Sequence, residues 1–180
     1  MKSSPIGKLD PDVKKDTVRV VIETPKHGRN KFAFDPDIQA FTLSSVLPVG
    51  ASFPFDFGFI PKTEGGDGDP LDVLLLMDEP AFPGCVVETR LVGVIEAVQI
   101  QRGKKVRNDR LVGVASESHL HRDIGTIGDL DPRLLDQIEE FFEAYNKAKG
   151  KGDRFEPKGR YGPKRARAVL EKGLRAARGR

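Results

Sequence analysis

Residues 67–72 read Asp67-Gly-Asp69-Pro-Leu-Asp72 and run directly into Val73-Leu-Leu-Leu76. The continuous apolar run is typical of a strand buried on both faces, and Gly and Pro place three carboxylates in a turn at its mouth. Carboxylates this close repel one another and raise each other's pKa unless a cation is present. Because hard divalent metals bind carboxylate oxygens, the turn is a candidate metal site. The alternative is a solvated acidic turn.

Short β-rich segments before and after this stretch predict further strands. They cover residues 18–22, 31–34, 41–43, 86–100 and 111–114, and clusters of Gly, Pro and Asp separate them. Many short strands without intervening helices favour an antiparallel barrel or sandwich.

The last third of the chain changes to helical periodicity. Asp131-Pro132 predicts a helix start, and apolar residues from Leu134 to Tyr145 recur on one face before Gly150. A second helix is expected over about residues 163–178. With no internal repeat and no domain boundary in the sequence, we expect residues 1–180 to form one domain. Its core is expected at about 18–150, followed by the basic C-terminal helix.

The composition is that of a folded protein rather than a disordered one, with 38% hydrophobic and 32% charged residues in a chain of 180. No stretch approaches the ~18 apolar residues of a membrane span, and the N-terminus shows no signal-peptide pattern. Cys85 is the only cysteine, which excludes an internal disulfide. These features predict a cytoplasmic protein.

The charge is unevenly distributed along the chain. Residues 146–180 contain 13 Lys and Arg against 3 Asp and Glu, whereas the rest contains 17 against 24. A basic segment can bind nucleic acid or form a solvated helix face. Apolar residues at helical spacing favour the helix face. Only Phe155 and Tyr161 could stack on bases there, so we do not expect a nucleic-acid partner.

The motif Asp67-Gly-Asp69-Pro-Leu-Asp72-Val-Leu resembles the signature of the family I soluble inorganic pyrophosphatases. Further stretches resemble that family in the same order, at residues 21–25, 30–32, 53–60, 83–84, 92–94 and 141–145. The resemblance covers roughly residues 18–150 and indicates a divergent bacterial-type member. It implies an α+β, mainly β fold, a small closed antiparallel β-barrel of OB type flanked by two C-terminal helices. It also implies a homo-oligomer, with a hexamer favoured.

The resemblance also implies the reaction, which is Mg²⁺-dependent hydrolysis of pyrophosphate to two orthophosphates. Mn²⁺ or Zn²⁺ are possible substitutes for Mg²⁺. Asp67 and Asp72 match metal ligands, and Glu23 matches an acid near a substrate-borne metal ion. Asp69 matches the carboxylate that takes the proton from the attacking water. Such a reaction depends mainly on positioning and on neutralising charge.

Two further residues match groups that hold the phosphates, Lys31 and Tyr145. The ammonium of Lys31 suits this role because it is a compact point charge that meets phosphate oxygens without fixed geometry. Where the family usually carries a phosphate-binding arginine, this chain has Ser45, and Ala33 stands where a glutamate is common.

The chain also departs from the family pattern after Val94. The bacterial family usually supplies two more metal-binding aspartates there and then a lysine, whereas this chain has Gln99 and then Arg107-Asn-Asp109-Arg110. We expect Asp109 to replace one metal ligand and Arg110 to replace the lysine. Lys147 is expected to replace another family lysine. Fewer carboxylates should weaken Mg²⁺ binding, and basic residues of this segment could partly substitute for metal charge.

Two other functions remain open at this point. One is a non-catalytic anion-binding or nucleic-acid-binding protein on the same fold, suggested by the missing acids and the basic C-terminal segment. The other is a phosphatase for a different phosphate anhydride or ester, because the missing arginine weakens the argument for strict pyrophosphate specificity.

Overall fold

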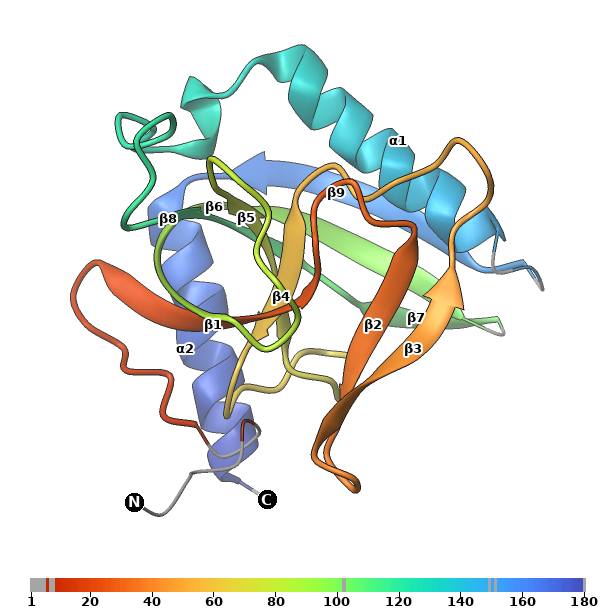
Figure 1. Ribbon diagram of the computed structural model, residues 1–180, viewed down its shortest axis with the longest axis horizontal. Helices are drawn as coiled ribbons and strands as arrows, with labels where there is room; N and C mark the ends of the chain where they lie inside the picture. The colour runs from red at the N-terminus through yellow and green to blue at the C-terminus, as the bar shows by residue number, and fades with distance from the viewer. Residues whose placement is uncertain (1–5, 7–8, 102, 149, 151, 180) are drawn as a thin grey trace.

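The computed structural model describes residues 6, 9–101, 103–148, 150 and 152–179. Figure 1 shows a mainly-β body with two helices on its outside, α1 (Pro132–Ala148) and α2 (Pro163–Arg178). A 3₁₀ turn, η2 (Ile127–Asp129), precedes α1. The strands are β1 (Thr17–Thr24), β2 (Asn30–Asp35), β3 (Ala40–Val46), β4 (Asp56–Ile60), β5 (Leu71–Leu76), β6 (Val86–Gln101), β7 (Lys104–Arg107), β8 (Arg110–Ala115) and β9 (Arg154–Tyr161).

Five strands close into a ring. β1 pairs with β4, β4 with β5, β5 with β8, β8 with β6, and β6 pairs back with β1. This confirms the predicted small closed barrel with two C-terminal helices. One detail of the prediction is wrong, because β5 and β8 run parallel. The long strand β6 lies between them in sequence and returns the chain to the same end of the ring.

The remaining strands lie outside the ring. β6 is 16 residues long and extends beyond it, pairing with β7 and β9. β2 and β3 form a separate two-stranded hairpin, which projects on the right of Figure 1. The sequence did not predict β4, β7 or β9. In β4, Gly58 allows a close approach, because a Cβ at this position would lie 2.2 Å from the carbonyl oxygen of Val21 on β1.

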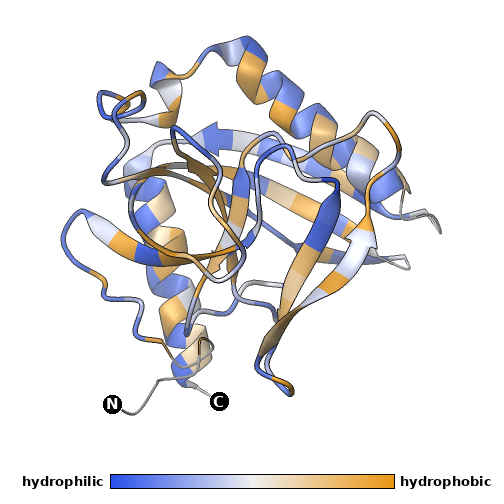
Figure 2. Ribbon diagram, in the orientation of Figure 1, coloured by the Kyte–Doolittle hydropathy of each residue, from blue (hydrophilic) through white to orange (hydrophobic). Residues whose placement is uncertain are grey.

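The core is split between the two faces of the sheet. Val73 and Leu75 of β5 pack in one cluster with Leu170 of α2. Leu74 and Leu76 pack in another with residues of α1. Alternate side chains of β5 therefore reach different clusters, as expected for a strand buried on both faces. The apolar bands on the strands and on one side of each helix are visible in Figure 2.

The two helices begin and end close to the predicted positions. At the start of α1, the carbonyl of Asp131 accepts hydrogen bonds from the amides of Leu134 and Leu135, and its carboxylate accepts one from the amide of Arg133. The buried residues of α1 are Leu135, Ile138, Phe142 and Asn146. The last of these is polar at a position where the helical stripe predicts an apolar side chain. In the described part of the chain, neither helix is long and apolar enough to cross a membrane.

Candidate functional site

A cavity of about 480 Å³ lies between the acidic turn, the β2 strand and the last turns of α1. It brings together side chains from β1, β2, β5, β8 and α1. Seven of the nine sequence-predicted site residues line it, namely Glu23, Lys31, Asp67, Asp69, Asp72, Arg110 and Tyr145. Residues far apart in the sequence therefore meet at one place in the fold.

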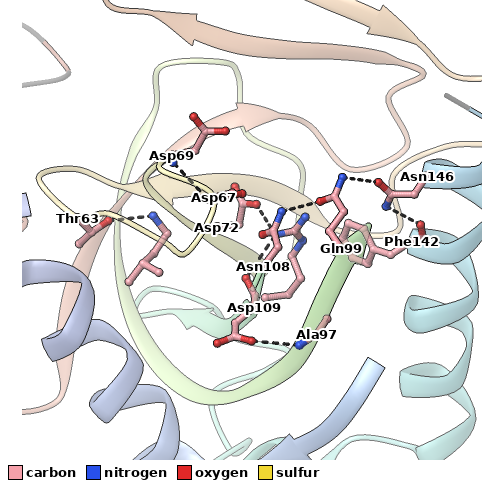
Figure 3. A network of polar contacts seen from close by, with 12 residues as sticks. Thr63, Asp67, Asp69, Asp72, Ala97, Gln99, Asn108, Asp109, Phe142 and Asn146 are labelled. Atoms are coloured by element: carbon pink, nitrogen blue, oxygen red, sulfur yellow. Dashed lines mark hydrogen bonds and ion pairs between the residues drawn. The ribbon is translucent and has the colours of Figure 1, made fainter. Parts of the chain in front are cut away.

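A buried threonine anchors the acidic turn to the barrel. The hydroxyl of Thr63 donates a hydrogen bond to the carbonyl of Ile60 at 2.6 Å and accepts one from the amide of Leu71 at 2.9 Å. Thr63 is 6% exposed, so both bonds form away from water. They tie the end of β4 to the start of β5 and thereby fix both ends of the turn; the bond to the Leu71 amide is drawn in Figure 3.

The turn itself is held by its own backbone. The amide of Gly65 donates to the carbonyl of Asp69 at 2.7 Å, and the amide of Asp69 donates to the carboxylate of Asp67 at 3.2 Å (Figure 3). Gly68 has φ +90°, a conformation that side chains other than glycine rarely adopt. The glycine in the motif therefore allows the sharp turn that brings Asp67 and Asp69 to the same cavity.

The carboxylates in the cavity influence one another. The pKa of Asp67 is raised by burial and by the negative charges of Asp72 and Asp69. The pKa of Glu23 is raised to about 7, chiefly by burial. The amide of Phe34 donates to Glu23 at 2.8 Å and opposes this rise. This clustering of negative charge favours binding of a cation.

The β2 strand carries the lysine into the cavity. The hydroxyl of Thr24 on β1 accepts a hydrogen bond from the amide of Phe32 at 3.1 Å, which attaches β2 to β1 beside the acidic turn. The ammonium of Lys31 lies 5.9 Å from the centre of the Phe57 ring. This cation is therefore placed at the cavity wall facing the acids.

Arg110 lies in the wall of the cavity and forms an ion pair with the acidic turn. Its Nη1 is 2.5 Å from Oδ2 of Asp72, and the same nitrogen donates to the side-chain oxygen of Asn108. The arginine side chain is 7% exposed. Its charge is thus held in the cavity by one carboxylate and one amide.

A chain of buried amides continues from Asn108 (Figure 3). Nδ2 of Asn108 donates to Oε1 of Gln99 at 2.7 Å, and Nε2 of Gln99 donates to Oδ1 of Asn146 at 2.8 Å. Nδ2 of Asn146 then donates to the carbonyl of Phe142 at 2.8 Å. Sequence reasoning did not assign a role to these three amides. The available signal was Asn146, a polar residue on the buried stripe of α1.

The comparisons with known proteins agree with this geometry. A family model described as inorganic pyrophosphatase matches residues 20–178. The chain belongs to this family. The resemblance stated from the sequence is thereby confirmed.

Individual relatives give the extent of the similarity. The inorganic pyrophosphatase of Thermus thermophilus is 39% identical over 151 residues, which is 84% of this chain and 82% of that protein. The one from Nostoc is 35% identical over 140 residues, covering 78% of this chain and 80% of that protein. The crystal structure of the Thermus thermophilus pyrophosphatase superposes with a TM-score of 0.89 at 34% identity, covering 98% of this chain and 100% of that chain. The Helicobacter pylori pyrophosphatase superposes with a TM-score of 0.87 at 33% identity, covering 96% and 99%.

Family I pyrophosphatases are metal-dependent, so the donor set of this cavity has to be compared with what a metal ion needs. Among the residues that the structure describes, no group of three or more His, Cys, Asp or Glu side chains is arranged to hold a metal ion. The acids of the turn instead lie on one side of an open cavity. Mg²⁺ commonly binds one or two carboxylates and takes its other ligands from water and substrate phosphates. Asp67 and Asp72 fit that pattern.

Two predicted site residues of this pyrophosphatase family member do not line the cavity. The carboxylate of Asp109 accepts from the amide of Ala97 at 3.0 Å and pairs with Nε of Arg107 at 2.6 Å. It faces a neighbouring cavity of about 460 Å³, which Asp67 and Asp72 also line. Asn108 and Arg110, which flank Asp109 in the sequence, both line the first cavity, and Asn108 also lines the neighbouring one.

The second of these residues is Lys147, which is exposed on α1. Its neighbour Asn146 points inward instead and joins the amide chain. The metal-binding role of Asp109 and the phosphate-binding role of Lys147 stay predictions. The position in the cavity expected for Asp109 is taken by the neutral Asn108.

Proposed function

We propose that this chain is an inorganic diphosphatase that uses Mg²⁺ to hydrolyse pyrophosphate to two orthophosphates. The observation that carries the proposal is the single cavity in which the acidic turn faces Lys31, Arg110 and Tyr145. Membership of the inorganic pyrophosphatase family supports the same activity. Acids for a metal and cations for phosphates on facing walls suit a multiply charged phosphate anhydride.

Asp67 and Asp72 are the residues proposed to hold the metal, and Glu23 lies near enough to influence it. When bound, Mg²⁺ supplies positive charge to the phosphate oxygens and makes a neighbouring water more acidic. Mn²⁺ or Zn²⁺ could serve as substitutes. The raised pKa of Asp67 supports this role, because bound cation relieves the repulsion among the carboxylates.

Asp69 is proposed to take the proton from the attacking water. Its backbone is fixed by hydrogen bonds to Gly65 and Asp67, whereas its side chain is exposed and lines the cavity. A positioned carboxylate of this kind acts as a general base.

The cations and the tyrosine are proposed to bind the phosphates. Lys31 provides a point charge from β2, and Arg110 provides a planar guanidinium from β8. Tyr145 lines the same cavity from α1, and Lys147 is proposed to act from the exposed end of that helix. Together they hold the two phosphate groups while the anhydride bond breaks.

The direct test is phosphate release from pyrophosphate by the purified chain, measured with Mg²⁺, Mn²⁺ and Zn²⁺ in turn. Asp69→Asn should lower turnover by about 10²-fold to 10⁴-fold while leaving the thermal unfolding curve unchanged. Asp123→Asn serves as a matched control, since Asp123 is exposed and does not line the cavity. Equal turnover in Asp69→Asn and the wild type would remove Asp69 from its proposed role.

A second substrate class has an observation in its favour. Ser45 lies opposite Lys31 in the β2–β3 register, so the position where the family usually carries a phosphate-binding arginine adjoins the cavity wall without a charge. This favours testing other phosphate anhydrides and esters beside pyrophosphate. Higher kcat/KM for one of them would redirect the substrate assignment.

Two arginines of the basic C-terminal segment form ion pairs with the rest of the protein. Arg160 pairs with Asp136 and Glu139 of α1, and Arg165 pairs with Glu96 of β6. These ion pairs reduce the charge that the segment presents to solvent. They therefore weaken the alternative of a nucleic-acid-binding protein, which a gel-shift series over salt would test.

Homo-oligomerisation, with a hexamer favoured, and a cytoplasmic location are also part of the proposal. Large apolar side chains are exposed at Phe82, Val86 and Leu120, at 69%, 43% and 76%. Exposed apolar surface of this kind favours association between copies. Light scattering coupled to size-exclusion chromatography would give the number of subunits.

A further inference from the structure

The ion pair between Arg110 and Asp72 concerns the residue proposed as a metal ligand. Nη1 of Arg110 lies 2.5 Å from Oδ2 of Asp72, and the two side chains are 7% and 21% exposed. Among the described residues, Asp72 is the one carboxylate with which Arg110 forms an ion pair. One oxygen of the proposed ligand is therefore already occupied by a cation that belongs to the chain.

The amide chain fixes the direction in which Asn108 faces. The carbonyl of Phe142 at one end can only accept a hydrogen bond, and the guanidinium of Arg110 at the other end can only donate. Each amide between them must therefore point its NH₂ group toward Phe142 and its oxygen toward Arg110. Asn146, Gln99 and Asn108 are 1%, 2% and 9% exposed, so water does not compete for these bonds.

Aromatic rings restrict the guanidinium on its other sides. Its central carbon lies 5.7, 5.1 and 5.7 Å from the ring centres of Phe57, Phe142 and Phe155. Nε of Arg110 is buried and has no hydrogen-bond partner in the described part of the chain. A buried donor without a partner is destabilising, so the surrounding contacts must outweigh that cost to keep the side chain in place.

The two amides nearest the guanidinium also determine which acid it pairs with. A carboxylate at the position of Gln99 or Asn108 would compete with Asp72 for the arginine. Neutral side chains at these positions accept and pass on hydrogen bonds without that competition. The positive charge is thereby directed to Asp72.

From this arrangement we propose that Arg110 is a built-in cation that takes the place of one divalent metal ion beside Asp72. The inference rests on the proposed function, because it treats Asp72 as a metal ligand. An arginine remains charged at all accessible pH values, so this charge is present whatever the metal concentration. The chain then needs fewer metal ions to neutralise the same phosphates, and the amide chain with the aromatic rings is the device that positions the arginine.

The test counts bound metal rather than turnover. Mn²⁺ is titrated into the wild type, Arg110→Gln and Arg160→Gln without pyrophosphate, and free Mn²⁺ is measured by electron paramagnetic resonance. We expect Arg110→Gln to bind one additional Mn²⁺ per chain, or to bind Mn²⁺ at least 10-fold more tightly. The control Arg160→Gln loses a guanidinium that pairs with Glu139 and Asp136 outside the cavity, and it should match the wild type.

Equal Mn²⁺ number and affinity in Arg110→Gln and the wild type would overturn the inference. If the glutamine variant does not fold, Arg110→Met gives the same reading, because methionine fills the space among the aromatic rings without a charge. Phosphate release by the wild type is measured separately. Absence of phosphate release by the wild type refutes the proposed function. Unchanged Mn²⁺ binding in Arg110→Gln refutes this inference alone.

Discussion

Glu23 offers the most quantitative prediction, because burial raises its pKa from 4.5 to about 7. The groups that act on this carboxylate are the amide of Phe34 and the ammonium of Lys31, which lower the pKa, and Asp72 and Asp69, which raise it. In the unfolded chain Glu23 loses its proton near the ordinary value. Between the two pKa values the folded state therefore binds more protons than the unfolded state.

The stability of the metal-free protein should consequently fall as pH rises from about 5 to 8. The difference between the two pKa values is roughly 2.5 pH units, and each unit corresponds to about 1.4 kcal/mol. Glu23 thus lowers the free energy of unfolding by up to about 3 kcal/mol above pH 7. Below pH 4.5 the residue is protonated in both states and has no such effect.

Glu23→Gln isolates this effect because glutamine keeps the oxygen that accepts from the amide of Phe34 but does not ionise. The assay is urea unfolding of both proteins in EDTA at pH 5, 6, 7 and 8. Groups that do not interact with Glu23 titrate alike in the two proteins, so the difference between their unfolding free energies reports on Glu23 and on the charges coupled to it, Lys31, Asp69 and Asp72. The variant should gain about 2.5 kcal/mol on the wild type between pH 5 and 8, and parallel curves would contradict this expectation.

Two further predictions concern the residues that position the cavity. Thr63→Val removes the acceptor of the Leu71 amide and the donor to Ile60, and should lower the free energy of unfolding by about 1–3 kcal/mol. A urea midpoint equal to that of the wild type would contradict it. Phe142→Ala removes a ring that is 1% exposed and packs against Phe57, and should cost about 3–5 kcal/mol. Calorimetry checks this value, and a loss below 1 kcal/mol would show that the core closes around the gap.

Periodicity was sufficient to predict the most regular elements. The continuous apolar run predicts that β5 is buried on both faces, and the apolar stripes predict which side of α1 and α2 is buried. β9 was not predicted because Pro157 and Gly159 interrupt its strand pattern. At these positions β9 pairs irregularly with β6. The parallel pairing of β5 with β8 depends on how the long β6 strand crosses the molecule, which no local pattern records.

In the candidate site, residues of one local motif could be predicted from the sequence, whereas residues from distant segments could not. Asp67, Asp69 and Asp72 could be predicted because they are neighbours in the sequence and belong to one motif. Gln99, Asn108 and Asn146 come from β6, the segment before β8 and α1, and neutral amides leave no charge pattern to connect them. Asn108 lines the cavity and its neighbour Asp109 does not. The sequence alone does not show which of two neighbouring residues faces the cavity.

The most direct test of the account is a crystal structure of the chain soaked with Mn²⁺ and measured at a wavelength where manganese scatters anomalously. The account predicts an anomalous peak at coordination distance from the carboxylates of Asp67 and Asp72, inside the cavity that Lys31 faces. Peaks found only elsewhere on the protein, or no peak at millimolar Mn²⁺, would contradict the claim that the acidic turn gathers divalent cations for pyrophosphate.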